Sequence, residues 1–262
     1  MRVSPLARFL LPLLFLLACV QPTLAKDLFV KAGASGDGSR EKPFGDPFEA
    51  LDKCEANDAI HIAEGKYYGK LGNGEWKIPY AGIQLLGGYN ATFTERDPWT
   101  HQTLLSWDRN SKNKPLSERI EVKEKGVVID GIVFDGQEQN QYSAPTEGRE
   151  PRDLDKADAL IHMWLPGTVK NCIFINTPRE GLVCANGTTV ENNLFMNVLD
   201  TALKINGLPP ADPASRTPAI IKNNTFIWAW DDRAPGQGRF SGTASSMSGP
   251  ATITGNILAF CD

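Results

Sequence analysis

The feature that most constrains this chain is a short motif that occurs three times in its second half. Each copy runs from a β-branched residue through a polar residue and an Asn-containing corner to an aromatic strand, at Val169–Asn176, Val190–Asn197 and Ile221–Trp228. Looser copies begin at Val128 and Ile253, so the first residues of the five copies are 41, 21, 31 and 32 positions apart. A period of 21 with insertions of roughly ten or twenty residues is typical of a solenoid with loops at chosen corners.

The corner of the motif favours β-strands. Asn tolerates the left-handed backbone of a sharp bend, and its amide can bond along a stack of identical neighbours. Phe174, Phe195 and Phe226 fall in register after the corner and are expected to stack inside. A leucine-rich repeat is the rival solenoid, but its L-x-x-L-x-L pattern is absent. The repeat therefore predicts an all-β fold, a right-handed parallel β-helix.

Residues 1–25 have the form of an export signal. A basic start precedes an apolar run, Phe9–Val20, which is too short to span a membrane, and a signal peptidase would cleave after Ala25. The alternative is a lipoprotein signal with Cys19 as the lipidated residue, which is less favoured because Leu is unusual at the second lipobox place. Either signal predicts a secreted, periplasmic or cell-surface protein, with 26–262 as one β-helix domain whose last coil pairs with something or continues.

The charge of the chain limits its partners. Its formal net charge is −4 and it contains no basic block, so nothing attracts nucleic acid or anionic lipid. Beyond the leader, no stretch is long enough for a membrane helix. An acidic surface also disfavours polyanions unless a local basic patch overrides it.

A short helix is expected to cover the open end of the first coil. Asp46 as N-cap, with Pro47 at the first helical position and Glu49 three residues on, predicts a helix start. Its apolar face is expected to consist of Phe48, Leu51 and Cys54.

Strands of the same coil period are expected to follow the helix. They are Ile60–Ala63, Ile83–Leu85 and Leu104–Leu105, whose first residues are 23 and 21 positions apart.

Several short sequences in this first third carry a family resemblance. They are Gly38-Ser39, Lys42-Pro43-Phe44, Glu49-Ala50-Leu51, Asp58-Ala59-Ile60, Glu64-Gly65-Lys66-Tyr67, Gly87-Gly88-Tyr89 and Arg96-Asp97-Pro98. With them, the mature chain resembles extracytoplasmic right-handed parallel β-helix proteins of the pectate-lyase-like superfamily. The resemblance implies the fold and leaves the reaction open, because members include lyases, hydrolases, epimerases and adhesins.

Three insertions, Gln137–Asp158, Gly207–Pro218 and Asp231–Gly242, are expected to wall one groove. The Asp231-Asp232 pair is a weak candidate for the acids of an inverting glycosidase, because adjacent loop residues splay apart. A Gly-His-Gly with Arg-x-Lys set, of the kind polygalacturonases carry, is absent, which favours a lyase over a hydrolase.

The 21-residue register predicts which side chains face outward from the strand before each corner. Ile161, Leu182 and Leu203 share one apolar column and are expected to point inward. The outward columns are then Glu121, His162, Val183, Lys204 and Ser246, and beside them Lys123, Trp164, Ala185, Asn206 and Ser248, bordered by Arg179, Glu180 and Asp200. A slip of one residue would invert this assignment.

The outward face has side chains suited to a polysaccharide lyase acting on uronate sugars. Such a lyase needs a cation for the carboxylate, a base for the C5 proton and a donor for the leaving oxygen. We assign Lys204 or Arg179 to the first two tasks and His162 to the third, with Trp164 stacking on a sugar ring. Asn206, Glu121 and Lys123 are the expected substrate-binding residues. The alternative hypothesis is a non-catalytic surface or adhesive scaffold that presents loops to a glycan.

Metal and cysteine chemistry are less strongly indicated. Asp37, Glu64 and Asp97 are considered as calcium ligands, although lone acids near Gly usually form turns. The mature cysteines match no metal-site spacing, and Cys172 and Cys184 are interpreted as a corner residue and a small core residue.

Overall fold

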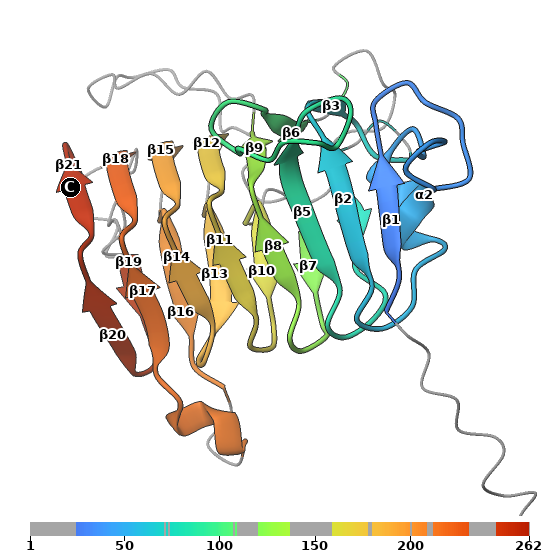
Figure 1. Ribbon diagram of the computed structural model, residues 1–262. Coiled ribbons are helices and arrows are strands. Elements are labelled where there is room, and N and C mark those ends of the chain that lie inside the picture. Colours follow the sequence, from blue (N-terminus) through green and yellow to red (C-terminus); the bar gives the residue numbers. More distant parts are fainter. Residues whose placement is uncertain are drawn as a thin grey trace, which may run out of the picture.

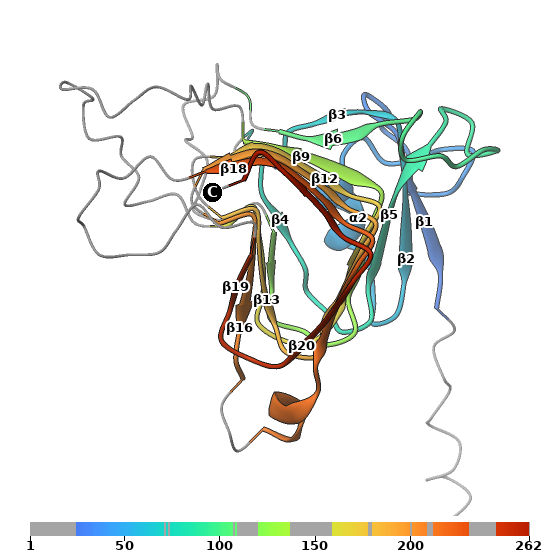
Figure 2. The same ribbon diagram turned by 90° about the vertical axis from the view of Figure 1, so that its left-hand side faces the viewer.

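The computed structural model describes residues 25–70, 72, 74–106, 108, 120–136, 159–177, 180–199, 201–208, 212–230 and 245–261. Their strands form three sheets, named here A, B and C, in which neighbouring strands are parallel. From β2 onward the chain visits the sheets in the repeating order A, B, C, which generates a solenoid (Figure 1). Viewed along the stack of coils, the three sheets form three sides of one tube (Figure 2).

The strands are short, and the described ones are as follows. Sheet A contains β1 (Asp27–Val30), β2 (Ala59–Ala63), β5 (Gln84–Tyr89), β8 (Val128–Asp130), β11 (Thr168–Lys170), β14 (Thr189–Glu191), β17 (Ala219–Lys222) and β20 (Ala251–Thr254). Sheet B contains β3 (Gly65–Tyr67), β6 (Thr103–Leu105), β9 (Ile132–Asp135), β12 (Ile173–Thr177), β15 (Leu194–Leu199), β18 (Thr225–Trp230) and β21 (Ile257–Ala259). Sheet C contains β4 (Trp76–Lys77), β7 (Ile120–Val122), β10 (Ile161–Met163), β13 (Leu182–Ala185), β16 (Leu203–Asn206) and β19 (Ser245–Met247). The predicted right-handed parallel β-helix is confirmed.

The interior of the tube contains the predicted aromatic stack. The ring centroids of Phe174 and Phe195 are 4.6 Å apart, and those of Phe195 and Phe226 are 4.9 Å apart. Phe134 from the preceding coil extends the stack, with its centroid 5.2 Å from that of Phe174. One buried ring per coil therefore runs along sheet B, and each ring contacts its neighbours face to face.

The two residues of each corner have different tasks. The first residue adopts the left-handed backbone, with φ of 54° at Asn171 and Asn192 and 56° at Asn223. Gly131 and Gly255 take the same place in the looser copies, with φ of 76° and 65°. Asn and Gly are the residues that accept this conformation at least cost, so the corner sequence follows from the bend.

In the last three corners the second residue is Asn193, Asn224 or Asn256, and these amides form an inner ladder. Asn193 Nδ2 donates to Val169 O at 3.0 Å and to Asn224 Oδ1 at 2.9 Å. Asn224 Nδ2 in turn donates to Asn256 Oδ1 at 3.0 Å. At the other end, the backbone N–H of Cys172 donates to Asn193 Oδ1 at 2.9 Å. The ladder therefore satisfies backbone groups that the corner removes from the sheet.

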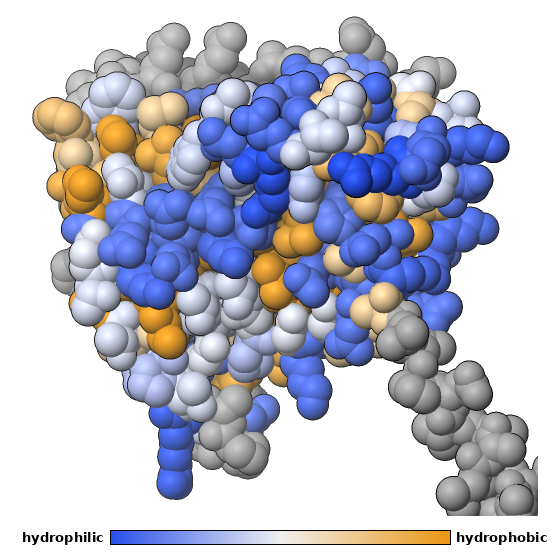
Figure 3. Space-filling view, viewed as in Figure 1, coloured by the Kyte–Doolittle hydropathy of each residue, from blue (hydrophilic) through white to orange (hydrophobic). Residues whose placement is uncertain are grey.

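The outer face of sheet A carries a row of alternating charges. The strand register aligns Asp130, Lys170, Glu191 and Lys222 on four successive coils. Lys170 lies 3.6 Å from Asp130, and Lys222 lies 2.9 Å from Glu191. Figure 3 shows a hydrophilic band over this part of the surface, across β11, β14 and β17.

The predicted cap at the start of the solenoid is present as α2 (Pro47–Leu51). Asp46 Oδ1 accepts from the backbone N–H of Phe48 at 3.1 Å, as expected for an N-cap. The helix packs on β1, β2 and β4, which places it over the first coil (Figure 1). Its apolar face differs from the prediction in one respect: Ala50 is fully buried, whereas Phe48 is half-buried under the Lys70 ammonium.

The strands expected in the first coils are present, but they do not occupy equivalent places on successive coils. Leu104–Leu105 belongs to β6 in sheet B, whereas Ile60–Ala63 and Ile83–Leu85 fall at the strands of sheet A. The insertion 207–218 connects β16 of sheet C to β17 of sheet A and includes the 3₁₀ turn η2 (Pro213–Arg216). The other two insertions, 137–158 and 231–242, lie outside the described residues, so the groove expected between the three insertions stays a prediction.

No helix in the described part of the chain is both long and apolar enough to cross a membrane.

Candidate functional site

The candidate site is the outer face of sheet C, where the strand register matches the one that the sequence predicts. His162 pairs with Glu121 on one side and Val183 on the other, and Val183 pairs with Lys204. The adjacent column brings Ala185 beside Asn206. Because inward residues alternate with outward ones, this register turns the named polar side chains away from the core.

An aromatic pair lies in the middle of this face. The rings of His162 and Trp164 are stacked, with centroids 3.9 Å apart and an angle of 22° between the planes. Trp164 Nε1 donates to Glu121 Oε1 at 3.1 Å, and the Lys123 ammonium lies 2.8 Å from the same oxygen. Trp164 is nevertheless 47% exposed, so its ring is held in place while its outer surface faces solvent.

Two hydrogen-bond donors, Lys123 and Trp164, favour the ionised form of Glu121. The hydrogen bond from Lys123 is the main reason that the pKa of the Glu121 carboxyl lies below its ordinary value, and desolvation opposes it more weakly. The indole hydrogen bond from Trp164 acts in the same direction as Lys123. Glu121 is thus a carboxylate that orients the aromatic pair, and the lowered pKa does not suit a general acid.

A second polar pair lies farther along the face. Lys204 Nζ is 3.3 Å from Glu180 Oε1, and Glu180 is buried, with only 8% of its surface exposed. Glu180 Oε2 has no hydrogen-bond partner among the residues that the structure describes. A buried carboxylate oxygen without a partner is energetically unfavourable, which marks this pair as a candidate functional group.

Two buried apolar residues separate the His162–Trp164 pair from the Lys204–Glu180 pair. Lys204 is two strands from His162, about 9.6 Å at the usual strand spacing. Val183 lies between them and is only 5% exposed, and Ala185 in the next column is 2% exposed. Both were predicted as outward residues, and they are outward in register yet buried.

Some predicted residues cannot be compared and others were missed. Arg179, Asp200, Ser246's side chain and the Asp231-Asp232 pair lie outside the described residues and side chains. Lys77 was not predicted from the sequence; it lies beside Glu121 in the outward column because β4 pairs with β7. Counting could not find it, because β4 has only two residues and its coil does not keep the 21-residue period. Glu180 was placed only at the border of the face; it comes two residues before β13, where strand periodicity gives no orientation.

The acids considered for calcium form turns or pair with other groups. Asp37 Oδ1 accepts from the backbone N–H of Ser39, and Asp97 Oδ1 from that of Trp99, both at 3.0 Å. Glu64 lies 2.9 Å from His101 Nδ1. No three metal-ligating side chains gather anywhere in the described residues, so these acids do not fit a calcium site.

The cysteines that the structure describes are all free. Burial raises the pKa of Cys172 and of Cys184 to about 12, so neither thiol ionises readily at neutral pH. Both residues fit the predicted structural roles.

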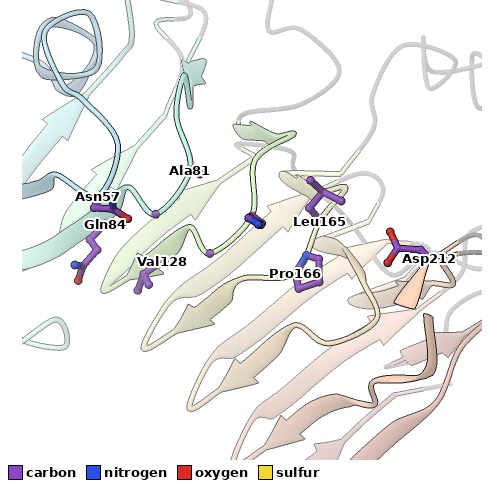
Figure 4. Close-up of a pocket in the computed structure, with 10 residues that line it drawn as sticks. Asn57, Ala81, Gln84, Val128, Leu165, Pro166 and Asp212 are labelled. Atoms are coloured by element: carbon purple, nitrogen blue, oxygen red, sulfur yellow. The ribbon is translucent and has the colours of Figure 1, made fainter. Parts of the chain in front are cut away.

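A separate open groove lies where sheet C turns into sheet A, and it has a volume of about 780 Å³ (Figure 4). Leu165 and Pro166 are among its apolar lining residues, with Asn57 and Gln84 toward one end and Asp212 toward the other (Figure 4). None of the predicted site residues lines it.

No protein-family model matches the chain, and no curated protein matches it in sequence. Solved structures with a similar fold include pectin methylesterases. One from carrot has a TM-score of 0.44 and 12% identity, covering 92% of this chain and 85% of that one. One from Aspergillus niger has a TM-score of 0.42 and 13% identity over 93% and 88% of the two chains. A pectin methylesterase variant in complex with a hexasaccharide has a TM-score of 0.39 and 10% identity over 91% and 93%.

The three parallel sheets, the inner amide ladder and the short cap of this chain together define its architecture. The sheet topology alone establishes the predicted fold, a parallel β-helix.

Proposed function

We propose that this is an exported protein that binds a polysaccharide on the outer face of sheet C. The observation that carries the proposal is the state of Trp164: the ring is 47% exposed, stacked on His162 and fixed by its hydrogen bond to Glu121. A ring that is held in one orientation loses little conformational freedom when it stacks on a sugar. Lys123 and Asn206 on the same face supply a cation and an amide for sugar carboxylates and hydroxyls.

Removal of the exposed ring tests this proposal. In affinity electrophoresis through gels containing polygalacturonate, alginate or a neutral glucan, Trp164→Ala should weaken binding about tenfold, equivalent to ~1.4 kcal/mol. The matched control is Trp99→Ala, because Trp99 is 45% exposed but lies outside the face. Equal mobility of the two variants and the unsubstituted protein in every gel that retards the protein would exclude Trp164 as the binding surface.

A second candidate function is uronate lyase activity at Lys204 and Glu180, favoured by the unpartnered carboxylate oxygen of Glu180. In such an elimination the C5–H and C4–O bonds break, a C4=C5 double bond forms, and the leaving oxygen takes up a proton. The Lys204 ammonium would bind the uronate carboxylate, Glu180 Oε2 would accept the C5 proton, and His162 would donate to the leaving oxygen. The contact with Glu180 at 3.3 Å places the Lys204 side chain beside the proposed proton acceptor, where its cation can bind the uronate carboxylate.

The ultraviolet absorbance of the unsaturated product distinguishes this lyase from the alternative, a non-catalytic scaffold. Lys204→Ala and Glu180→Gln should each lower turnover about a hundredfold or more, as expected for groups acting in the transition state. Lys222→Ala is the matched control, because Lys222 forms a similar ion pair with Glu191 on another face. Binding without turnover in the unsubstituted protein would support the scaffold, and full activity in Lys204→Ala would exclude the site.

A further inference from the structure

The strands of sheet B share a second sharp bend, and its occupants change along the solenoid. Asn176, Asn197, Trp228 and Phe260 occupy this bend on four successive coils, each with φ of 54°. In the first two coils the amides form an outer ladder: Asn197 Nδ2 donates to Asn176 Oδ1 at 2.9 Å, and Asn176 Nδ2 donates to Asp135 Oδ1 at 3.1 Å. In the next two coils aromatic side chains replace the amides.

The aromatic residues are the less favourable choice for the fold at this bend. A left-handed backbone brings Cβ close to the following carbonyl oxygen, and a bulky residue in this conformation is rare, whereas Asn is enriched there. Burial does not offset the strain, since Trp228 is 51% exposed and Phe260 is 80% exposed. Residues held in such conformations concentrate at sites with a function.

The two rings form one exposed surface. Their centroids are 6.4 Å apart, with an angle of 37° between the planes. Figure 3 shows apolar surface gathered over β18 and β21, at the same end of the molecule. The row continues from Trp228 through Asn197 and Asn176 to Asp135, so amide and carboxylate groups extend the line of the rings along the solenoid.

We propose that Trp228 and Phe260 form a second polysaccharide-binding surface, on the outer face of sheet B. The apolar faces of pyranose rings stack on aromatic side chains, and their hydroxyls bond to amides and carboxylates. Successive coils are about 4.8 Å apart, roughly the length of one sugar unit, so a glycan along this row would meet one side chain per sugar. The inference rests on the proposed function only in naming the same class of ligand; the residues and the sheet are different.

Replacement of the aromatic residues by Asn should stabilise the protein but weaken its binding of polysaccharide. Trp228→Asn removes the ring, relieves the strain and lets the outer amide ladder continue, so the denaturation midpoint should rise. The same variant should bind the polysaccharide that retards the unsubstituted protein about tenfold more weakly. Phe260→Asn should act in the same two directions. Trp99→Asn is the matched control for Trp228→Asn, because Trp99 is 45% exposed but is not in the left-handed conformation.

Every outcome of this experiment bears on the proposal. Unchanged polysaccharide binding in Trp228→Asn and Phe260→Asn would overturn it, whether the midpoint rises or falls. Loss of self-association in light scattering, with binding unchanged, would assign the rings to a protein contact and also overturn it. A loss of binding in Trp228→Asn alone, together with a lower midpoint, would show that the ring supports the fold. Weaker binding in Trp164→Ala with normal binding in both Asn variants would leave the sheet C site standing and refute this one.

Discussion

The inner amide ladder makes one residue, Asn193, unusually costly to replace. Its side chain accepts from the Cys172 N–H and donates to Val169 O and to Asn224 Oδ1. Asn193→Ala therefore leaves the buried Cys172 N–H without its acceptor and removes the two hydrogen bonds that the amide donates. An unpaired buried group costs about 1–3 kcal/mol and each lost hydrogen bond about 0.5–1.5 kcal/mol, so we expect the free energy of unfolding to fall by about 2–6 kcal/mol.

The neighbouring Asn192 provides the matched control for urea or guanidinium denaturation. It is exposed and has φ of 54°, and its side-chain amide donates to Asn171 Oδ1 at 2.7 Å. Asn192→Ala should therefore cost about 1–2 kcal/mol, the strain of a non-glycine residue in the left-handed region. If Asn193→Ala destabilised the protein no more than Asn192→Ala, the division of the corner into an outer bend and an inner ladder would be wrong.

Two further perturbations address the core and the first coils. Phe195→Ala should lower the free energy of unfolding by about 3–5 kcal/mol, because Phe195 is fully buried between two stacked rings. Phe260→Ala, at an exposed position, should change the free energy of unfolding by less than about 0.5 kcal/mol. Equal denaturation midpoints for the two variants would contradict the stack. The hydrogen bond to Glu64 is the main cause that raises the pKa of His101 above its ordinary value of 6.5. The stability from this contact should be fully present below pH 6.5 and disappear as pH rises through the folded-state pKa, so thermal midpoints measured across that range should lose this pH-dependent component in His101→Gln and retain it in the unsubstituted protein.

The register of the second half could be predicted because its coils carry an uninterrupted repeat. Between Ile161 and Ile205 the 21-residue period holds without insertion, so counting alone aligned His162 with Val183 and Lys204. The aromatic stack followed from the same count. These positions are fixed by alternation along a strand, which a sequence displays directly.

Other features depend on contacts that periodicity does not encode. Both residues of an Asn-Asn corner look alike in sequence, yet Asn192 takes the bend and Asn193 takes the ladder, because only one can point inward. Glu180 precedes its strand, so its burial beside Lys204 depends on the path of the connection. The equal spacing of Ile60, Ile83 and Leu104 does not show that Leu104 lies in a different sheet, because connections of different length can give equal spacing.

The charge row on sheet A constrains how such a solenoid can lengthen. Because Asp130, Lys170, Glu191 and Lys222 alternate in sign from coil to coil, duplication of a single coil would place two like charges side by side. Like charges directly opposite on neighbouring strands destabilise a sheet by roughly 0.2–1 kcal/mol. Duplication of two adjacent coils would preserve the alternation. An engineered longer version should therefore be extended by an even number of coils. The charges that impose this even number lie on a face that takes no part in the candidate site.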